Sequence, residues 1–389
     1  MAFLLENGFR YPNQRMVFRK IRESGVVTRR QLMQQTDLSF QTVSNIVAEL
    51  SDTALVLSDG LANQSAGKRA ELLKVNPDGL YAVGVLLDRA GLEAVLIDLL
   101  GNCRIQQRMP FSSSHPDAVL RQMADITQRF LAEARVSPER FAGVGISTPG
   151  PIDFRTGAVS RPPNFPEWTF VPLQQRLGDM LGCPVTLFKD SHAAALAEIW
   201  ALNNAVPSSF FYLYFSAGIG GALVVDRRVW TGFSGNAGEI GHVAVAPSPG
   251  CDCGRTGCLE AVWSLSRLAS EAGVSVEEYA QSIAYGSESY LANWLQGIPW
   301  LARAVVDAAN VIEPEALVIG GPQGQAVGPS LIAPLSEALQ REGFVHNLRP
   351  MLVRAASAQN AAGIGAGLMR LNAALAPDIG LPATLGLDI

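Results

Sequence analysis

Long hydrophobic runs are missing from this sequence. A membrane-spanning helix needs roughly 18 or more uncharged apolar residues in a row, and no stretch of the chain provides them. Glu6 and Arg10 also interrupt the N-terminal segment, which therefore lacks the apolar region of a secretory signal peptide. We expect a cytoplasmic protein that is not associated with a membrane.

Cysteine is scarce: the 389 residues include 5. Cys103 and Cys183 are isolated in apolar surroundings, which favours reduced thiols that fill core space in a reducing compartment. Charged residues make up 17% of the chain and hydrophobic residues 48%, which is typical of a soluble globular protein. At this length we expect two or three domains.

The other three cysteines form a C-x-C-x4-C cluster after a histidine, and the four residues are His242, Cys251, Cys253 and Cys258. Neighbouring glycines let the backbone turn tightly enough to direct several thiolates at one point. The pattern predicts a tetrahedral Zn²⁺ site; the alternatives are ordinary buried thiols or a strained disulfide. Four protein ligands leave no open position, so the zinc is expected to be structural and to hold Glu239 and Glu260 in place.

Charge is distributed unevenly along the chain. The first 77 residues hold ten Lys or Arg and seven Asp or Glu, a charge of +3, which leaves −8 for the rest of a chain whose net charge is −5. A basic first segment on an acidic body indicates that only the N-terminal part contacts a polyanion.

Residues 12–77 have the pattern of three helices and a β-hairpin. We expect a first helix that ends near Gly25, a second over residues 29–35, and a third that begins after Ser39 and carries an apolar stripe at helical spacing. Two short strands that follow would form a wing. The pattern predicts a winged helix–turn–helix domain over residues 1–78.

The exposed face of the third helix is expected to present uncharged hydrogen-bonding groups that could read base edges in a major groove. These residues are Ser39, Gln41, Thr42, Ser44 and Asn45. Basic side chains placed to contact phosphates are Arg29, Arg30, Lys68 and Arg69. The alternative is an ordinary solvated helix face. Operator DNA is therefore the expected macromolecular partner.

The rest of the chain alternates between strands and helices. Two series, one from Tyr81 and one from Phe210, each begin with strands joined by hairpin turns and continue into strand–helix units. This repetition predicts an α/β fold of two lobes, residues 79–200 and 201–389, with a ligand in a cleft between them. We expect the C-terminal helix to pack back on the first lobe.

Motifs in these segments resemble the ROK family of sugar kinases and sugar-responsive repressors. They span nearly the whole chain and comprise Thr148–Pro151, Pro163–Asn164, Asp190, Gly218–Gly221, Gly238–His242, the cysteine cluster and Gly320–Pro322. The resemblance implies a two-lobed actin-like (ribonuclease H-like) fold. Because a winged helix precedes it, the resemblance also implies a transcriptional regulator of carbohydrate genes.

The resemblance further implies a sugar site. The positions that match the family's sugar-binding motifs are Asn164, Lys189, Asp190, Glu239, His242 and Glu260. Carboxylates accept paired hydrogen bonds from neighbouring hydroxyl groups, so the three acids suit a sugar ligand in their own right.

The sequence departs from the family at both phosphate sites. Family kinases have Asp-x-Gly-Gly-Thr in the first hairpin, whereas the aligned stretch here reads Leu86-Leu-Asp-Arg-Ala90. In the second phosphate loop Ala217 stands where the kinases have threonine. Both changes remove contacts to phosphate, so Asp190 at the general-base position would have no positioned nucleoside triphosphate. We therefore expect a ligand sensor and not an enzyme.

Two further departures concern the ligand. Lys189 replaces an asparagine, and His192 replaces a second asparagine that usually follows. Lys189 could pair with Asp190 and point outward, or it could face the cleft and favour an anionic, acylated amino or phosphorylated sugar. His192 is expected to be a structural histidine.

Together these observations predict a dimeric repressor that binds an operator and changes its affinity for that DNA when a carbohydrate enters the cleft; assembly into a tetramer is left open. One alternative is an ATP-dependent sugar kinase with a DNA-binding head. Another is a repressor whose inducer is a protein partner.

Overall fold

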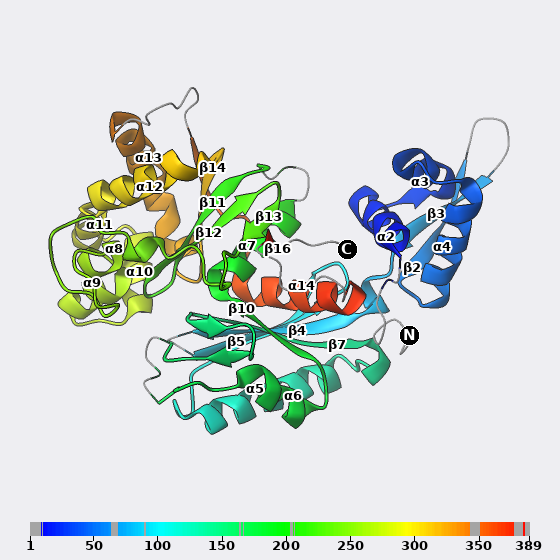
Figure 1. The fold of residues 1–389 in the computed structure, drawn as a ribbon, viewed down its shortest axis with the longest axis horizontal. Helices are drawn as coiled ribbons and strands as arrows, with labels where there is room; N and C mark the ends of the chain where they lie inside the picture. The colour runs from blue at the N-terminus through cyan, green and yellow to red at the C-terminus, as the bar shows by residue number, and fades with distance from the viewer. Residues whose placement is uncertain are drawn as a thin grey trace. The chain divides into compact units, whose positions relative to one another are not determined.

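The computed structural model describes residues 9, 11–63, 69–88, 91–162, 165, 167–202, 205, 207–342, 351–376 and 384–385 (Figure 1). The chain forms two compact units. The first unit runs to Phe188 and resumes at Gly363; the second begins at Lys189 and continues to Ala362.

The first unit opens with the helices and hairpin that the sequence predicts. The elements are α2 (Pro12–Ser24), β1 (Val27–Thr28), α3 (Arg29–Thr36), α4 (Phe40–Asp52), β2 (Val56–Asn63) and β3 (Arg69–Val75). The expected apolar stripe of α4 is buried, and the strands form a three-stranded sheet in the order β1-β3-β2. β1, which the sequence analysis missed, leads directly into α3, whose first turn Thr28 caps by accepting the N–H of Gln31.

A five-stranded sheet forms the body of the first unit, in the order β10-β7-β4-β5-β6. Its strands are β4 (Tyr81–Asp88), β5 (Gly91–Asp98), β6 (Cys103–Met109), β7 (Phe141–Thr148) and β10 (Val185–Lys189), and the small hairpin β8 (Ile152–Asp153) and β9 (Ala158–Val159) follows β7. Helices α5 (Pro116–Glu133) and α6 (Leu173–Leu181) cover one face, where alternate valines, leucines and isoleucines of the strands are buried against them.

Helix α14 (Ala361–Leu375) covers the opposite face of this sheet (Figure 1). Glycines allow its backbone to touch the strands: a Cβ atom on Gly84 would lie 1.9 Å from the carbonyl oxygen of Gly363, and one on Gly145 would lie 2.0 Å from that of Ala366. No side chain fits at either strand position, so α14 is held against β4 and β7 by direct backbone contact.

The second unit repeats the same topology. Its six-stranded sheet has the order β15-β14-β11-β12-β13-β16, with β11 (Phe210–Phe215), β12 (Ile219–Val225), β13 (Arg228–Trp230), β14 (Ala316–Gly320), β15 (Leu352–Ala355) and β16 (Thr384–Leu385). In both sheets a three-stranded antiparallel meander is extended by a strand parallel to its first strand. The predicted duplication is therefore present.

Helices of the second unit surround a large apolar core with β11 and β14. They are α8 (Leu259–Val262), α9 (Leu265–Ala272), α10 (Val276–Ala284), α11 (Glu288–Leu295), α12 (Ile298–Ile312) and α13 (Gly324–Glu342). α8 and α9 are separate helices, because Ser264 caps a new helix by accepting the N–H of Arg267. Trp263, in the break, stacks on Trp294 with ring centroids 4.1 Å apart.

The unit boundary lies earlier than the expected boundary at residue 200. Helix α7 (Asp190–Leu202) packs on β11, β12 and β13, so it belongs to the second unit although it directly follows β10 of the first. Residues 363–376, which include most of α14, belong to the first unit, whereas β16 belongs to the second.

The described part of the chain bears on two further expectations, which concern membrane-spanning helices and Cys103. No helix there is long and apolar enough to cross a membrane. Cys103 is exposed, because it lies on the edge strand β6, so its interpretation as a core residue is wrong.

Replacement of Gly84 by alanine tests the backbone docking of α14. The added methyl group would collide with the Gly363 carbonyl, and we expect Gly84→Ala to lower the free energy of unfolding by about 1–3 kcal/mol or more in urea denaturation. The matched control is Gly178→Ala in α6, whose added Cβ would have its nearest neighbour at 3.5 Å. Equal stability of both variants would contradict the docking.

Candidate functional site

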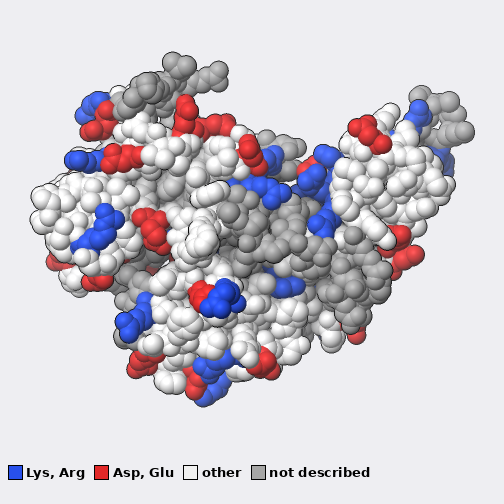
Figure 2. All heavy atoms as spheres, in the orientation of Figure 1, with Lys and Arg blue, Asp and Glu red and all other residues white. Residues whose placement is uncertain are grey.

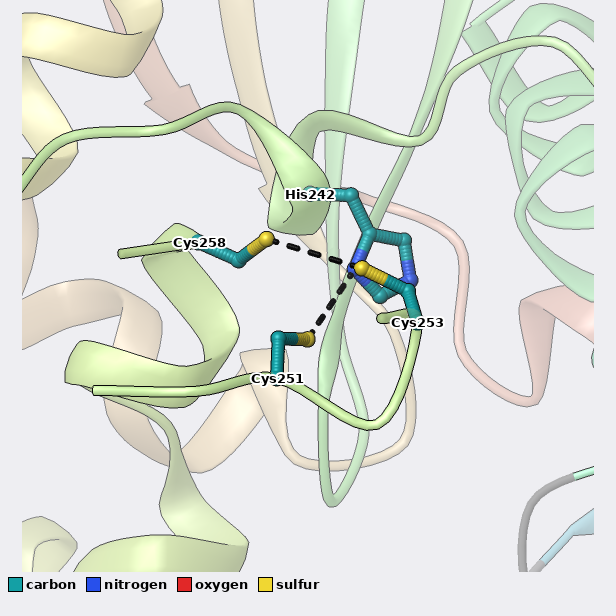
Figure 3. A group of neighbouring side chains, drawn as sticks. All are labelled: His242, Cys251, Cys253 and Cys258. Atoms are coloured by element: carbon teal, nitrogen blue, oxygen red, sulfur yellow. Dashed lines mark hydrogen bonds between the residues drawn. The ribbon is translucent and has the colours of Figure 1, made fainter. Parts of the chain in front are cut away.

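One histidine and three cysteines converge in the second unit. His242 lies in the short helix η4 (Ile240–His242), Cys251 and Cys253 lie in the following loop, and Cys258 precedes α8. Their ligand atoms all lie within 4.8 Å of one another, and their side chains point toward a common centre (Figure 3). The cluster predicted from the sequence is therefore assembled, and it could hold a metal ion.

Glycines and short backbone hydrogen bonds shape this loop. Gly254 and Gly257 have φ of 86° and 69°, the left-handed region that favours glycine. A Cβ on Gly257 would lie 1.5 Å from the Ala246 carbonyl oxygen. The N–H of Cys251 donates to the carbonyl of Arg255 at 2.8 Å. This tight turn is what places the two loop sulfurs opposite Cys258.

The sulfurs differ in how readily they ionise. Burial, followed by the neighbouring thiols, raises the pKa of Cys258 to about 12. A hydrogen bond from the Arg255 backbone N–H lowers the pKa of Cys253. A buried thiol such as Cys258 needs a bound cation beside it to ligate as a thiolate. Nδ1 of His242 faces the group, 3.6 Å from Sγ of Cys251, which leaves Nε2 for another partner.

The segment that contains Glu239 and His242 lies directly against β12. A Cβ on Gly238 would be 2.1 Å from the Gly221 carbonyl oxygen, and one on Gly241 would be 2.2 Å from that of Ile219. Close backbone approach is therefore required at both glycines of the Gly-Glu-Ile-Gly-His sequence.

Glu260 is held against the same strand. Its Oε2 accepts the N–H of Ile219 at 2.8 Å, and a Cβ on Gly218 would lie 2.2 Å from that oxygen. Gly218 thus leaves room for the carboxylate. Because Oε2 already accepts this bond, Oε1 is the less occupied oxygen and the better acceptor for a ligand.

Lys189 does not pair with Asp190 and does not point outward. Its side chain is buried, and its ammonium group donates to Oε1 of Glu239 at 2.7 Å and to the carbonyl of Ala237 at 2.9 Å. Glu239 itself is half exposed. The lysine therefore supports Glu239 from the protein side and compensates its negative charge.

His192 contacts the same carbonyl as Lys189. Its Nε2 lies 3.0 Å from the Ala237 oxygen, which makes Nε2 the protonated ring nitrogen. Burial first, and the nearby charge of Lys189 second, lower its pKa to about 3, so the ring is neutral. The two side chains that depart from the family pattern thus share one acceptor, and the structure supports the structural interpretation of His192. No sequence signal pointed to the Ala237 carbonyl.

Asp190 begins α7 and is buried, and its Oδ1 accepts the N–H of Ser191 at 2.6 Å. Asn164 lies outside the described residues, as does Lys68 of the wing. Among the residues described, Asp190, Glu239, His242 and Glu260 all belong to the second unit.

The predicted DNA-contacting face of α4 is exposed in part. Gln41 and Asn45 are exposed and hydrogen-bond each other at 2.8 Å. Ser39 caps the helix by accepting the N–H of Thr42 at 3.1 Å. The hydroxyl oxygen of Ser44 is buried, because this residue borders the apolar stripe, so the expectation that it presents its hydroxyl to a groove is wrong.

The basic residues around α3 also differ in their surroundings. Arg30 and Arg69 are exposed, whereas Arg29 forms an ion pair with Glu71 of β3. That arginine lowers the pKa of Glu71 through the hydrogen bond it donates. Arg29 therefore joins α3 to the wing in addition to carrying positive charge.

Comparison with known proteins identifies the chain's relatives. The model of the ROK family matches residues 83–372. The chain belongs to the ROK family. A similar crystal structure is described as a ROK family transcriptional regulator, a homologue of the E. coli MLC protein. It shares the α/β fold of this chain with a TM-score of 0.78 and 23% sequence identity. The match covers 93% of this chain and 96% of the regulator. The predicted fold class is thereby confirmed.

Relatives of this ROK protein include both regulators and kinases. The xylose repressor of Caldicellulosiruptor bescii is 26% identical over 354 residues, which cover 86% of this chain and 88% of the repressor. The glucokinase of Thermotoga maritima is 36% identical over 215 residues, which cover 50% of this chain and 68% of the kinase.

The stretch that the sequence resemblance aligns with the first phosphate loop of ROK kinases lies at the end of β4. Leu86 and Leu87 are buried and pair with β5, and the strand continues through Asp88 to the tight pairing of Asp88 with Gly91. Arg89 and Ala90 lie outside the described residues. In the second loop Ala217 is buried, and its carbonyl accepts the N–H of Ser266 at 2.8 Å.

A buried carboxylate in this ROK protein escaped the sequence analysis. Glu198 of α7 is fully buried and accepts hydrogen bonds from Arg354 at 2.7 Å and from the N–H groups of Ser357 and Ala358 at 2.8 and 2.9 Å. It thereby fixes the chain after β15, just before Gly363, where the first unit resumes. The sequence signal that could have revealed it is that Glu198 is an isolated acid within an alanine-rich, apolar part of the helix.

The neutral state of His192 predicts a specific pH dependence. Its folded pKa of about 3 lies below the unfolded value of about 6.5, so the unfolded chain binds the proton first. This stabilising contribution is present above pH 6.5 and is lost as the pH falls toward 3. Between pH 6.5 and 5 we expect a loss of about 2 kcal/mol in unfolding free energy from this group.

The His192→Asn variant should lack that contribution. In urea titrations its unfolding free energy should therefore fall less steeply with decreasing pH than that of the wild type. His115→Asn is the control, because His115 is exposed. Both variants keep the four-residue cluster, so loss of metal in acid affects them equally. Parallel pH profiles for the two variants would show that His192 is not buried as a neutral ring.

Proposed function

We propose that this ROK protein is a carbohydrate-responsive transcriptional regulator, and specifically a repressor. The observation that carries the proposal is the three-helix and hairpin segment before residue 83, outside the family match, with exposed amide side chains on α4. The similarity to a xylose repressor over 86% of the chain supports it, since that match extends beyond the kinase-like body.

The segment from α2 to β3 is proposed to act as a winged helix–turn–helix. Gln41 and Asn45 would read base edges, with Ser39 and Thr42 near the backbone at the start of α4. Figure 2 shows several Lys and Arg side chains together at one edge of this segment. The exposed Arg30 and Arg69, together with Lys68 and in part Arg29, would contact phosphates. A homodimer would place two such segments on two half-sites of an operator.

The sugar or sugar derivative is proposed to bind at the acids of the second unit. Asp190, the half-exposed Glu239 and the remaining oxygen of Glu260 would accept hydrogen bonds from hydroxyl groups. His242 would donate or accept through Nε2, and Asn164, outside the described residues, is proposed as a further sugar ligand. Since two donors of Lys189 are already used, its role is to hold Glu239 and to leave at most one N–H for the ligand.

The four-residue cluster is proposed to bind one structural Zn²⁺ per chain through His242, Cys251, Cys253 and Cys258. With all four ligands supplied by the protein, the metal would anchor the loop and leave no position for a reacting water. Through His242 the anchor would also set the position of the sugar-binding segment that ends at this residue.

Ligand binding is proposed to change DNA affinity through the two units. Lys189 stands at one crossing of the chain between the units, and Glu198, on the same helix, fixes the chain just before the other crossing. A ligand that prefers one arrangement of the units would alter the spacing of the two DNA-binding segments in the dimer.

A second candidate function is an ATP-dependent sugar kinase. It is favoured by Asp190, which stands at the start of α7 in the general-base position of the family, and by the 36% identity to a glucokinase. The buried end of β4 disfavours it, because backbone N–H groups paired within a sheet are not available to phosphate.

The regulator proposal is tested by fluorescence anisotropy of labelled DNA from the region upstream of the protein's own coding sequence. We expect binding at low salt without sugar, and release on titration with one of a panel of monosaccharides and sugar phosphates that includes D-xylose. Asp190→Asn and Glu260→Gln should keep the DNA affinity and lose the response to sugar. Absence of DNA binding at low salt would contradict the proposal.

The kinase alternative has its own readout. A coupled assay with Mg-ATP across the same sugars is expected to show no turnover above background. Turnover that Asp190→Asn abolishes would establish the kinase in place of the sensor.

The metal is tested by elemental analysis of purified protein. Wild type should contain about one zinc per chain, and Cys253→Ser should lose most of it and melt at a lower temperature. Cys103→Ser is the matched control, because Cys103 is likewise an exposed cysteine but lies outside the cluster. Full zinc content in the Cys253 variant would refute the assignment.

A further inference from the structure

Phe40, which the sequence analysis did not single out, is an exposed aromatic residue on the proposed DNA-contacting helix. The four other large hydrophobic side chains of α4 are buried, whereas 54% of Phe40 is exposed. It is the first residue of the helix, directly after the capping residue Ser39. About half of its surface is therefore available for a contact outside the core.

The position of Phe40 in the helix indicates what that partner is. In helix–turn–helix proteins, residues in the N-terminal turn of the second helix contact base edges in the major groove. α3 and α4 form such a pair, joined by a turn in which Asp37 adopts a left-handed conformation with φ of 55°. Phe40 therefore precedes Gln41 in the turn that would enter the groove.

The chemistry of the ring restricts the contact further. Phenylalanine has no hydrogen-bonding group, and the apolar feature that a base pair displays in the major groove is the C5-methyl group of thymine. Amide side chains such as Gln41 and Asn45 suit adenine, the partner of thymine. Gln41, the residue after Phe40, hydrogen-bonds to Asn45 on the same helix, which orders these two amide groups.

We infer that Phe40 is a specificity-determining residue that packs on a thymine methyl group in the major groove of each half-site. The inference rests on the proposed DNA-binding function and adds to it the base that is read. The operator would then contain an A·T pair at this position, selected by an apolar contact and not by a hydrogen bond.

The test uses the full-length protein and the tightest duplex that it selects from a random-sequence DNA pool in the absence of sugar. Each thymine is replaced singly by uracil, which removes only the C5-methyl group. With wild type we expect one position per half-site at which uracil weakens binding about three- to tenfold. At the other positions the affinity should be nearly unchanged.

Phe40→Ala should weaken binding to the thymine duplex by a similar factor and should no longer distinguish thymine from uracil at that position. Phe40→Leu should keep part of the discrimination. Tyr285→Ala is the control, since Tyr285 is an 88% exposed aromatic residue outside the first unit and should keep both affinity and uracil sensitivity. Unchanged melting temperatures check that each variant folds.

The outcomes separate this inference from the function on which it rests. Selection of no duplex would contradict both. A selected duplex that binds wild type equally well with uracil at every position would contradict the inference alone, as would a uracil effect that persists in Phe40→Ala. In either case Phe40 would contact another part of the chain or a second copy.

Discussion

The candidate ligand site depends on one close contact, the approach of backbone residues 238–242 to strand β12. Gly238 and Gly241 lie so near the carbonyls of Gly221 and Ile219 that no other residue fits there without movement. This contact brings Glu239 to Lys189 and places His242 beside the cysteines. A larger side chain at either glycine would move Glu239 and the proposed metal ligand His242 together.

Lys189 and His192 show how the chain accommodates two departures from the family pattern. Both side chains direct a donor at the Ala237 carbonyl, and Lys189 also compensates the charge of Glu239. A buried ammonium group without such partners would be costly. Where the family resemblance places two amide side chains, this chain therefore has one hydrogen-bonded arrangement that also includes the Ala237 carbonyl of the loop before Glu239.

Much of the fold was predictable because local patterns and tertiary packing agree. The α4 stripe, the meander strands and the glycine-rich cysteine turn all carry strong local signals, and each is present. The long helix α13 was missed because Pro329 and Pro334 lie inside it. The break at Trp263 depends on stacking with Trp294, a contact between residues far apart in sequence.

The site was predictable to a similar degree. Residue types and spacing indicated the cluster of four ligands and the acids beside it. The partner of Lys189 could not be read from sequence, because it is a backbone carbonyl and a carboxylate about fifty residues away. Likewise, the buried hydroxyl of Ser44 follows from the packing of α4 and not from its residue type.

In a sensor, sugar and DNA each favour a different state of the same conformational equilibrium. In a protein whose sugar site and DNA-binding segment are independent, they do not. For a sensor, linkage requires that sugar weaken DNA binding by the same factor by which DNA weakens sugar binding. The most direct measurement is calorimetric titration of the inducing sugar into the free protein and into the operator-bound protein. We expect sugar to bind the DNA complex about 5- to 150-fold more weakly, by the same factor by which saturating sugar lowers the DNA affinity. Equal sugar affinity in both states would contradict it.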